Sequence, residues 1–299
     1  MRLIAGRYEL QKELGAGGMG AVWLGHDQVL GRSVAIKEIR LAATGATKLT
    51  AAAFREARAA AALNHTHIVP VYDVVEYRSR PWIVMLAVEG LTLQQRVQAD
   101  GPIDPDVIAA VGVNLASALD AAHGQGIVHR DVKPSNVMLA QDEHPWLVDF
   151  GIAQPRSCGT IDETSALVDG PPIISRAAKG SAGYAAPEQV RGDPPEPPVD
   201  VFGLGATLYY AVEGEHAFSG DDAWATLMAP QFETPRRPRR AGRLGSILLR
   251  MMARQPDERP TLEEVQTALR LPPRRTCFPP RRRHSGAAPL GVTVATSAR

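Results

Sequence analysis

The sequence predicts an α+β protein in which a small, sheet-rich lobe is followed by a larger, mostly helical lobe. Two observations lead to this fold class. Short stretches of alternating or clustered apolar residues, separated by Gly and Asp, fill residues 8–40, whereas apolar residues recur at helical spacing after about residue 91. With 299 residues, 44% of them hydrophobic, the chain is long enough to bury a core without disulfide bonds.

The first lobe is expected to be mostly sheet with one helix. Strand patterns occupy residues 8–14, 20–27, 32–39, 67–76 and 81–90. Between them, the stretch LTAAAFREARAAAALNH at residues 49–65 is rich in Ala and lacks Gly and Pro, which predicts a helix.

The second lobe is expected to be helical. Helical spacing of apolar residues is found at residues 106–126, 199–214, 244–255 and 261–271. Residues 154–182 and 191–198 are rich in Gly, Ser and Pro and predict no regular structure. The Arg- and Pro-rich stretch after residue 271 is expected to be disordered, because prolines and like charges cannot bury a core.

Charge and cysteine content narrow the class of protein. The net charge is +1, but residues 272–299 hold six arginines and no acid, which leaves residues 1–271 at −5. Cys158 and Cys277 are far apart in sequence, so no disulfide framework is expected. No apolar run approaches the length of a membrane span or a signal peptide. We therefore expect a cytoplasmic protein without a transmembrane segment.

The stretch LGAGGMGAVW at residues 14–23 places glycines at positions 15, 17 and 20, a spacing that lets a backbone close over phosphates. On its own, this pattern fits a dinucleotide-binding turn, a hairpin lid over ATP or a glycine-rich turn without ligand. The residues AVWL after Gly20 are strand formers, and a dinucleotide fold would require a helix there. The pattern therefore favours the hairpin lid.

A lysine and a glutamate complete the chemistry of the first lobe. Lys37, in VAIK, lies on a predicted strand 17 residues after Gly20, so a hairpin can bring its ammonium group under the lid. Glu56 shares a helix face with Ala53 and Ala60, and a glutamate on an inward face requires a cation. The alternative is an exposed glutamate, because arginines flank it on the same helix.

The motifs HRDVKPSN at residues 129–136, DFG at 149–151 and APE at 186–188 follow in that order. Together with the glycine-rich loop, Lys37 and Glu56, they make this chain resemble the eukaryotic-type (Hanks-type) serine/threonine protein kinases of bacteria. The resemblance covers roughly residues 8–271. It implies a bilobal kinase fold, with an N-lobe at 1–88, a C-lobe at 89–271 and a tail at 272–299.

The resemblance also implies a role for each motif residue. Asp131, Lys133, Lys37 and Glu56 would be catalytic, with Asp131 accepting the hydrogen of the attacking hydroxyl. Asn136 and Asp149 would hold Mg²⁺, or Mn²⁺ in its place, through hard oxygen ligands. In the family, Lys133 and Ser181 occupy positions typical of Ser/Thr specificity.

By the same resemblance, ATP would be bound between the lobes, with Met85 as gatekeeper. Its site would be formed by Leu14, Gly15, Gly17, Gly20, Val22, Ala35, Lys37, Met85, Leu86 and Val88. The stretch MLAV at residues 85–88 departs from the acidic and aromatic pair common in relatives. Because the hinge recognises adenine through its main chain, we expect altered inhibitor preference and retained ATP binding.

The remaining expectations concern scaffold and regulation. Glu188 and Arg259 resemble a buried pair that anchors the activation segment, residues 149–188, and Asp200 resembles the acid that holds the catalytic loop. Autophosphorylation, with self-association, is expected in that segment at Thr164, Ser175 or Thr160, because Arg130 resembles a phosphate-binding cation. Protein substrates carrying Ser or Thr are the expected partners.

Two alternative functions are weighed against this interpretation. A pseudokinase scaffold would keep the fold, but such proteins usually lack the lysine or an aspartate that this sequence retains. A nucleic-acid-binding protein could use the basic tail or the arginine cluster at 235–243, but neither has interleaved aromatic residues, so no nucleic acid is expected. His65 and His67 have H-x-H spacing but are assigned to a turn rather than to a metal site.

Overall fold

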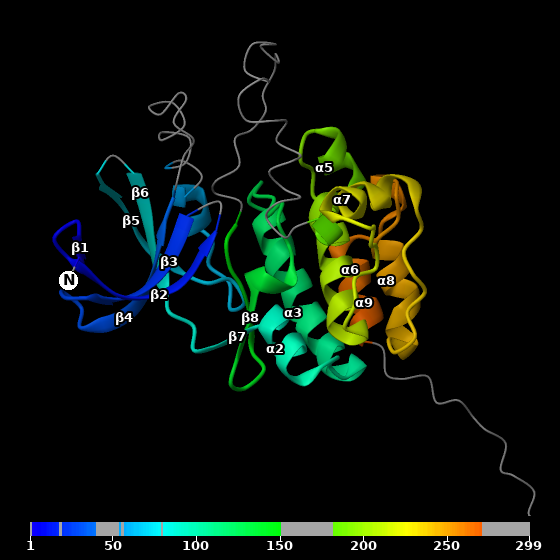
Figure 1. The fold of residues 1–299 in the computed structure, drawn as a ribbon, viewed down its shortest axis with the longest axis horizontal. Helices are drawn as coiled ribbons and strands as arrows, with labels where there is room; N and C mark the ends of the chain where they lie inside the picture. The colour runs from blue at the N-terminus through cyan, green and yellow to red at the C-terminus, as the bar shows by residue number, and fades with distance from the viewer. Residues whose placement is uncertain are drawn as a thin grey trace, which may run out of the picture.

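The computed structural model describes residues 2–17, 20–39, 54, 57–78, 80–150 and 182–270. The two predicted units are both present, a sheet lobe at one end and a helical lobe at the other (Figure 1). The α+β class inferred from the sequence is confirmed.

The N-lobe contains one six-stranded sheet. Its strands are β1 (Arg2–Ile4), β2 (Tyr8–Gly17), β3 (Gly20–Asp27), β4 (Arg32–Glu38), β5 (Val71–Tyr77) and β6 (Arg80–Leu86). They are arranged in the order β1-β2-β3-β4-β6-β5, and every neighbouring pair is antiparallel. The sequence patterns predicted five of these strands and missed β1, because three residues are too few to show a periodicity.

The predicted helix at residues 49–65 lies only partly within the described residues. Residues 54 and 57–61 are helical, and residues 63–65 are not. The predicted end was therefore too late. The Ala-rich composition continues past the point where the helix stops, and composition alone does not mark that point.

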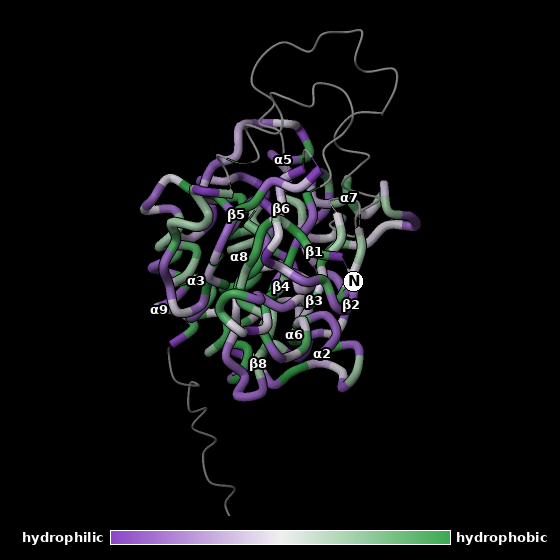
Figure 2. The backbone as a smooth tube through the Cα atoms, turned by 90° about the vertical axis from the view of Figure 1, so that its left-hand side faces the viewer, coloured by the Kyte–Doolittle hydropathy of each residue, from purple (hydrophilic) through white to green (hydrophobic). Residues whose placement is uncertain are grey.

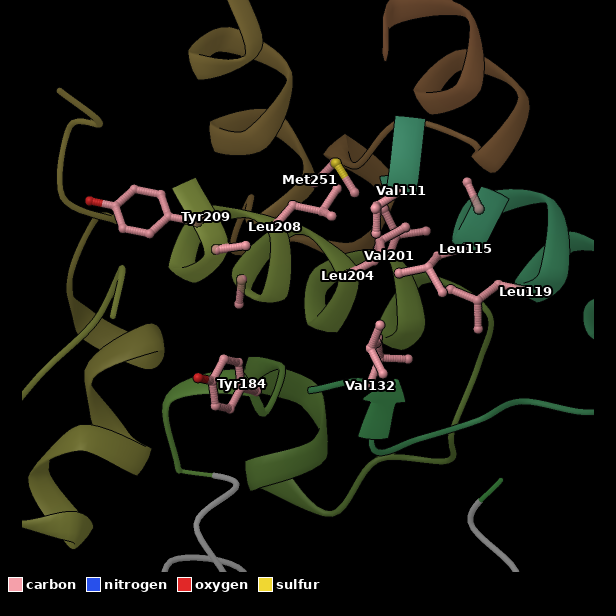
Figure 3. Close-up of a cluster of buried hydrophobic side chains, with 14 of the residues drawn as sticks. Val111, Leu115, Leu119, Val132, Tyr184, Val201, Leu204, Leu208, Tyr209 and Met251 are labelled. Atoms are coloured by element: carbon pink, nitrogen blue, oxygen red, sulfur yellow. The ribbon is translucent and has the colours of Figure 1, made fainter. Parts of the chain in front are cut away.

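The C-lobe is built around one central helix, α6 (Pro198–Glu213), in which every residue from Val199 to Val212 is buried. Helices α3 (Pro105–His123) and α8 (Gly245–Met251) both contact α6 (Figure 1). Figure 3 shows side chains from α3 and α6 meeting in this core, with Val132 reaching it from a loop. The other helices are α2 (Leu93–Asp100), α5 (Pro187–Arg191), α7 (Ala223–Phe232) and α9 (Leu262–Arg270).

Short elements join the lobes and complete the C-lobe. Strands β7 (Gly90–Thr92), β8 (Val137–Ala140) and β9 (Pro145–Leu147) form a separate antiparallel sheet. The 3₁₀ turns are η1 (Pro134–Asn136), η3 (Ala182–Tyr184), η4 (Gly242–Leu244) and η5 (Pro256–Glu258). Sequence patterns predicted neither this sheet nor α7. The three strands are short, and α7 contains Pro230, which normally argues against a helix.

Among the described residues, α3 is the one helix long and apolar enough to cross a membrane. Half of its apolar window is buried inside the lobe, against α6 and α9, so its composition is that of a core helix. Figure 2 shows hydrophobic segments running through the interior, whereas many of the peripheral turns are hydrophilic.

Candidate active site

Strand β4 divides the N-lobe into a core face and a cleft face. Val34 and Ile36 are fully buried among Tyr8, Trp82 and other core side chains. Because side chains alternate along a strand, Ala35 and Lys37 face the other side. The predicted lysine is therefore held on the cleft side of the sheet by the packing of its neighbours.

The cleft is lined by apolar side chains from both lobes. Ala35 and Met85 are paired across β4 and β6, and both are buried. Trp146 and Val148, on the C-lobe side, pack against the same cluster, as does Val22 of β3. An apolar slot enclosed from two sides is suited to a flat ring such as adenine.

The glycine-rich stretch is a hairpin, as the sequence predicted. Gly17 on β2 lies opposite Gly20 on β3, and Gly15 lies opposite Val22. Gly20 has a φ of 138°, which favours glycine. Val22 is in turn paired with Lys37 on β4, so the lid and the lysine are aligned across three neighbouring strands. Leu14, before the first glycine, is 54% exposed.

The predicted hinge follows β6 directly. The Leu86 N–H donates a hydrogen bond to the Pro70 carbonyl oxygen at 3.1 Å, which ties the hinge to the segment before β5. Leu86 and Val88 both pack onto the apolar cluster that contains Met85. A small pocket continues behind Met85 to Lys37 and Asp149. Met85 therefore belongs both to the apolar cluster of the cleft and to the lining of this small pocket.

Lys37 and Asp149 form an ion pair across the cleft, with Nζ 2.8 Å from Oδ2. Burial opposes ionisation of the Asp149 carboxyl, but the Lys37 ammonium outweighs it and holds the pKa below its usual value. Lys133 lowers that pKa further. Asp149 also has a positive φ of 61°, a conformation that bulkier residues rarely adopt and that is frequent at functional sites.

Asp131 is held by two neighbours in the catalytic loop. The Lys133 ammonium lies 2.8 Å from its Oδ2. The Asn136 Nδ2 donates to the Asp131 carbonyl oxygen at 2.8 Å and to its Oδ2 at 3.2 Å. The three predicted residues of this loop therefore form one contact group.

His129 connects the catalytic loop to the DFG segment. The Asp131 N–H donates to Nδ1 of His129 at 3.3 Å, so the ring proton of the neutral imidazole is placed on Nε2. That nitrogen donates to the Val148 carbonyl oxygen at 3.0 Å. The ring also lies 4.6 Å from Phe150, centroid to centroid. The histidine thereby fixes Asp131 relative to the residue before Asp149.

Asp200 holds the backbone of the catalytic loop from α6, as expected. Its carboxylate accepts the N–H groups of His129 and Arg130, each at 2.7 Å. Arg130 has a φ of 68°, and these bonds help to maintain that conformation. On the same helix, a Cβ at Gly203 would lie 2.9 Å from the Val132 carbonyl oxygen, so α6 touches the loop directly.

The expected Glu188–Arg259 pair is also present. Its two hydrogen bonds measure 2.5 and 2.8 Å. The other three N–H groups of Arg259 donate to the carbonyl oxygens of Pro198, Ala253 and Arg254. All five donors of the guanidinium are thus satisfied.

The residues expected to hold a divalent cation have suitable chemistry and lie close together. The Val148 N–H donates to the Asn136 carbonyl oxygen at 3.0 Å, so Asn136 is bonded to the residue before Asp149. Asp149 favours the carboxylate form and is 30% exposed. Among the described residues, no group of three or more His, Cys, Asp or Glu side chains could hold a metal by itself. One carboxylate and one amide, completed by phosphate oxygens and water, suit Mg²⁺.

Several expected residues lie outside the described part of the chain. These are Glu56, Ser181, Thr160, Thr164, Ser175, Cys158, Cys277 and the tail at 272–299. His65 and His67 are described, and each has a polar neighbour within the fold. His67 Nδ1 lies 3.0 Å from the Pro145 carbonyl oxygen, and His65 Nε2 lies 3.2 Å from the Ser117 hydroxyl.

Three site residues were not singled out from the sequence. Trp146 and Val148 line the apolar cleft, and His123 Nε2 lies 2.8 Å from Oδ2 of Asp200. Val148 could have been found by its position directly before DFG. His123 contacts a residue 77 positions away, and its own neighbours in sequence carry no sign of that contact.

The comparisons with known proteins agree with this geometry. Residues 8–269 match the family model described as the protein kinase domain. The chain therefore belongs to the protein kinase family, and the resemblance drawn from its motifs is confirmed.

Its curated relatives are bacterial. The chain is 35% identical to the serine/threonine-protein kinase PknB of Mycolicibacterium smegmatis over 99% of its length, and 36% identical to PknB of Mycobacterium tuberculosis over 86%. It spans less than half of those proteins, 46% and 41% respectively.

Solved structures confirm the bilobal kinase fold. Two crystal structures of the Mycobacterium tuberculosis PknI kinase domain, the second of them a point mutant, have TM-scores of 0.69 and 0.67. Their sequences are 26% and 27% identical to this one, and each match covers 90% of this chain and 96% of the other.

Proposed function

We propose that this chain is a serine/threonine protein kinase, which transfers the γ-phosphoryl group of ATP to Ser or Thr hydroxyls of proteins. One observation carries the proposal. Two ion pairs, Lys37–Asp149 and Lys133–Asp131, each at 2.8 Å, lie in one cleft, and Lys133 is near enough to Asp149 to lower its pKa. Two carboxylates and two ammonium groups in that arrangement can position a phosphate chain and an attacking hydroxyl.

ATP would be held by the cleft face of the N-lobe. Its adenine would enter the apolar slot between Ala35 and Trp146, against the main chain of residues 86–88. Its phosphates would lie under the β2–β3 hairpin, where Lys37 is aligned with Val22 and Gly15. The ammonium group of Lys37 would then be shared between the phosphates and Asp149.

Asp131 would receive the proton of the substrate hydroxyl as the hydroxyl oxygen attacks the γ-phosphorus. The bond between that phosphorus and the β–γ bridging oxygen breaks, and ADP leaves. A positioned general base contributes roughly 100- to 10,000-fold to the rate of such a step. Lys133, bonded to the same carboxylate, would stabilise the charge of the transferred group.

Asn136 and Asp149 would hold Mg²⁺, or Mn²⁺ in its place. When bound, the cation supplies positive charge that neutralises the phosphates. The depressed pKa of Asp149 keeps its carboxylate ionised for this role.

Two finer proposals accompany this function. The first is autophosphorylation between residues 149 and 188, with Thr164, Ser175 and Thr160 as acceptors in that order. The second is the domain division, with an N-lobe at 1–88, a C-lobe at 89–271 and a dispensable tail at 272–299. The division is supported by α9, which ends at Arg270, and by the family match, which ends at residue 269.

The test is transfer of labelled phosphate from ATP to a mixture of Ser and Thr peptides in the presence of Mg²⁺. The Asp149→Asn variant should lose transfer, whereas the matched Asp221→Asn variant, changed at an exposed aspartate, should keep it. Mass spectrometry of the same two proteins checks residues 160–175 for phosphate. If ATP binds but no phosphate is transferred, the chain is a pseudokinase scaffold instead.

A further inference from the structure

The turn between α7 and η4 carries an unusual concentration of positive charge. Residues 235–243 read PRRPRRAGR, and Arg236, Arg237, Arg239 and Arg240 are all exposed. We call these four side chains the arginine turn. It lies on the outer side of the C-lobe, away from the N-lobe (Figure 1).

Two other exposed arginines on the described surface are paired with an acid, Arg80 with Glu38 and Arg191 with Asp193. The half-buried Arg96 pairs with Asp100. In the arginine turn, only Arg236 has such a partner in the described part of the chain, Glu215 at 3.8 Å. The turn therefore presents charge that the fold itself does not neutralise.

The backbone of the turn is fixed although its side chains are exposed. The carboxylate of Glu213, the last residue of α6, accepts the N–H groups of Arg239, Arg240 and Ala241 at 2.7 to 3.0 Å. The Arg236 N–H donates to the Ala217 carbonyl oxygen at 2.9 Å. Pro235 and Pro238 restrict φ as well. A rigid turn loses little backbone entropy when a partner binds.

Three acids lie close to the turn in sequence. Glu213 accepts the three main-chain N–H groups, and Glu215 and Glu233 are exposed. The local net charge is still positive, because four arginines face these three acids.

An exposed aromatic side chain adjoins the turn. Phe232, the last residue of α7, is 73% exposed, the highest value among the large hydrophobic side chains of the described residues. Its neighbour Gln231 donates to the Pro187 carbonyl oxygen of α5 and accepts from Arg191. Gln231, next to Phe232, thus bonds the end of α7 to the helix at the end of the activation segment.

We infer that Phe232 and the arginine turn form a docking surface for a short acidic segment of a protein substrate, one that carries a hydrophobic residue beside its Asp or Glu side chains. Guanidinium groups bind carboxylates in a bidentate geometry, and Phe232 would accept the apolar residue. This inference rests on the proposed kinase function, because the partner is a substrate.

A long polyanion fits less well. Residues 1–271 carry a net charge of −5 despite this turn, so a polyanion that extends beyond the turn meets a lobe of net negative charge. The four arginines lie within five residues, which spans at most about 18 Å of chain. A short acidic segment can use that length without meeting the acidic surface around it.

Binding is tested first, without catalysis. A labelled peptide with six Glu and one Phe is titrated with the full-length protein and followed by fluorescence anisotropy. The Arg237→Gln, Arg239→Gln, Arg240→Gln triple variant should weaken binding about tenfold, and added salt should weaken binding to the unchanged protein. The matched control changes three other exposed arginines, Arg250→Gln, Arg254→Gln and Arg270→Gln, and should bind as the unchanged protein does.

Transfer is tested second. A Ser/Thr peptide joined to the acidic block by a flexible linker should have a lower KM than the same peptide without the block, at equal kcat. The arginine triple variant should remove that advantage, a rise in KM of about tenfold, and leave the plain peptide unaffected. The reduction in KM caused by the acidic block should be greatest at an intermediate linker length.

The two experiments distinguish a failure of the docking surface from a failure of the kinase function. Binding that survives in the arginine triple variant, or falls equally in the control, overturns the inference. So does tighter binding to duplex DNA or to phosphatidylserine vesicles than to the acidic peptide. If the peptide binds through the arginine turn but no phosphate is transferred to any peptide, the docking surface stands and the kinase function fails.

Discussion

The cleft and the interior of the C-lobe both contain an ion pair, and the two pairs differ in their surroundings. Arg259 and Glu188 are 0% and 7% exposed, and every donor of the arginine is bonded within the protein. Lys37 and Asp149 are 11% and 30% exposed. A saturated pair can only hold the fold together, whereas a partly open pair retains oxygen and nitrogen atoms that a ligand can reach. Residue type alone does not distinguish these roles.

The largest expected effect is in the cleft. Changing Asp131→Asn removes the proposed proton acceptor and leaves the side chain nearly the same size, so kcat should fall by roughly 100- to 10,000-fold. The free energy of unfolding should change by less than about 1 kcal/mol, because Asp131 is held mainly by groups of its own loop. Peptide phosphorylation and urea denaturation measure the two quantities. If the Asp131→Asn variant were much less stable than the unchanged protein, Asp131 would have a structural role like that of Glu188 and Arg259.

The opposite result, a loss of stability, is expected for the buried pair of the C-lobe. Arg259→Met leaves Glu188 buried without its cation, which should lower the free energy of unfolding by about 3 to 5 kcal/mol. The double variant Glu188→Gln, Arg259→Met should recover part of that loss, because no buried charge remains. Urea denaturation of the three proteins provides the measurement. Equal stability of the single variant and the unchanged protein would contradict the scaffold role.

A second scaffold pair, Arg7–Asp27 in the N-lobe, should show its role through pH. Two hydrogen bonds from the Arg7 guanidinium to the Asp27 carboxylate, both 2.7 Å, lower the pKa of Asp27 from 3.8 to about 2. A carboxyl whose pKa is lower in the folded than in the unfolded protein stabilises the fold at pH values above its unfolded-state pKa. That stabilisation disappears as the pH falls through the folded-state pKa.

The Asp27→Asn variant should therefore be less stable than the unchanged protein above about pH 4, and the difference should shrink as the pH approaches about 2. Thermal denaturation at a series of pH values measures it. A difference that stays constant over this range would mean that the carboxyl is not ionised in the folded protein.

The smallest effect is expected where an ion pair is exposed on a helix. Arg96 and Asp100 are four residues apart on α2, at 2.8 Å, and are 31% and 59% exposed. Arg96→Ala should lower the free energy of unfolding by no more than about 0.5 kcal/mol and leave phosphate transfer unchanged. If Arg96→Ala lowered the free energy of unfolding as much as Arg259→Met, exposure would not distinguish ion pairs that stabilise the fold from those that do not.

The sequence located the cleft residues better than the fold around them. Lys37, Asp131, Asn136 and Asp149 were found because each lies in a short motif, and those motifs keep their order along the chain. Strand β1 and helix α7 were missed, because a three-residue strand has no period and Pro230 argues against a helix.

The walls of the site were harder to predict for another reason. Trp146 lines the cleft only because β8 and β9 form a hairpin beside the hinge, and this pairing has no local signal. The contact between His123 and Asp200 likewise depends on how α3 packs against α6. Such contacts follow from tertiary packing.

The two hydrogen bonds from the catalytic loop to Asp200 should slow the exchange of the amide hydrogens that form them. The amide hydrogens of His129 and Arg130 belong to a loop, yet both are bonded to a carboxylate on the most deeply buried helix of the C-lobe. They can exchange with solvent only when α6 separates from the loop, an opening that disrupts the core of the lobe. In deuterium exchange, these two loop positions should therefore be among the slowest in the chain, alongside the interior of α6 itself.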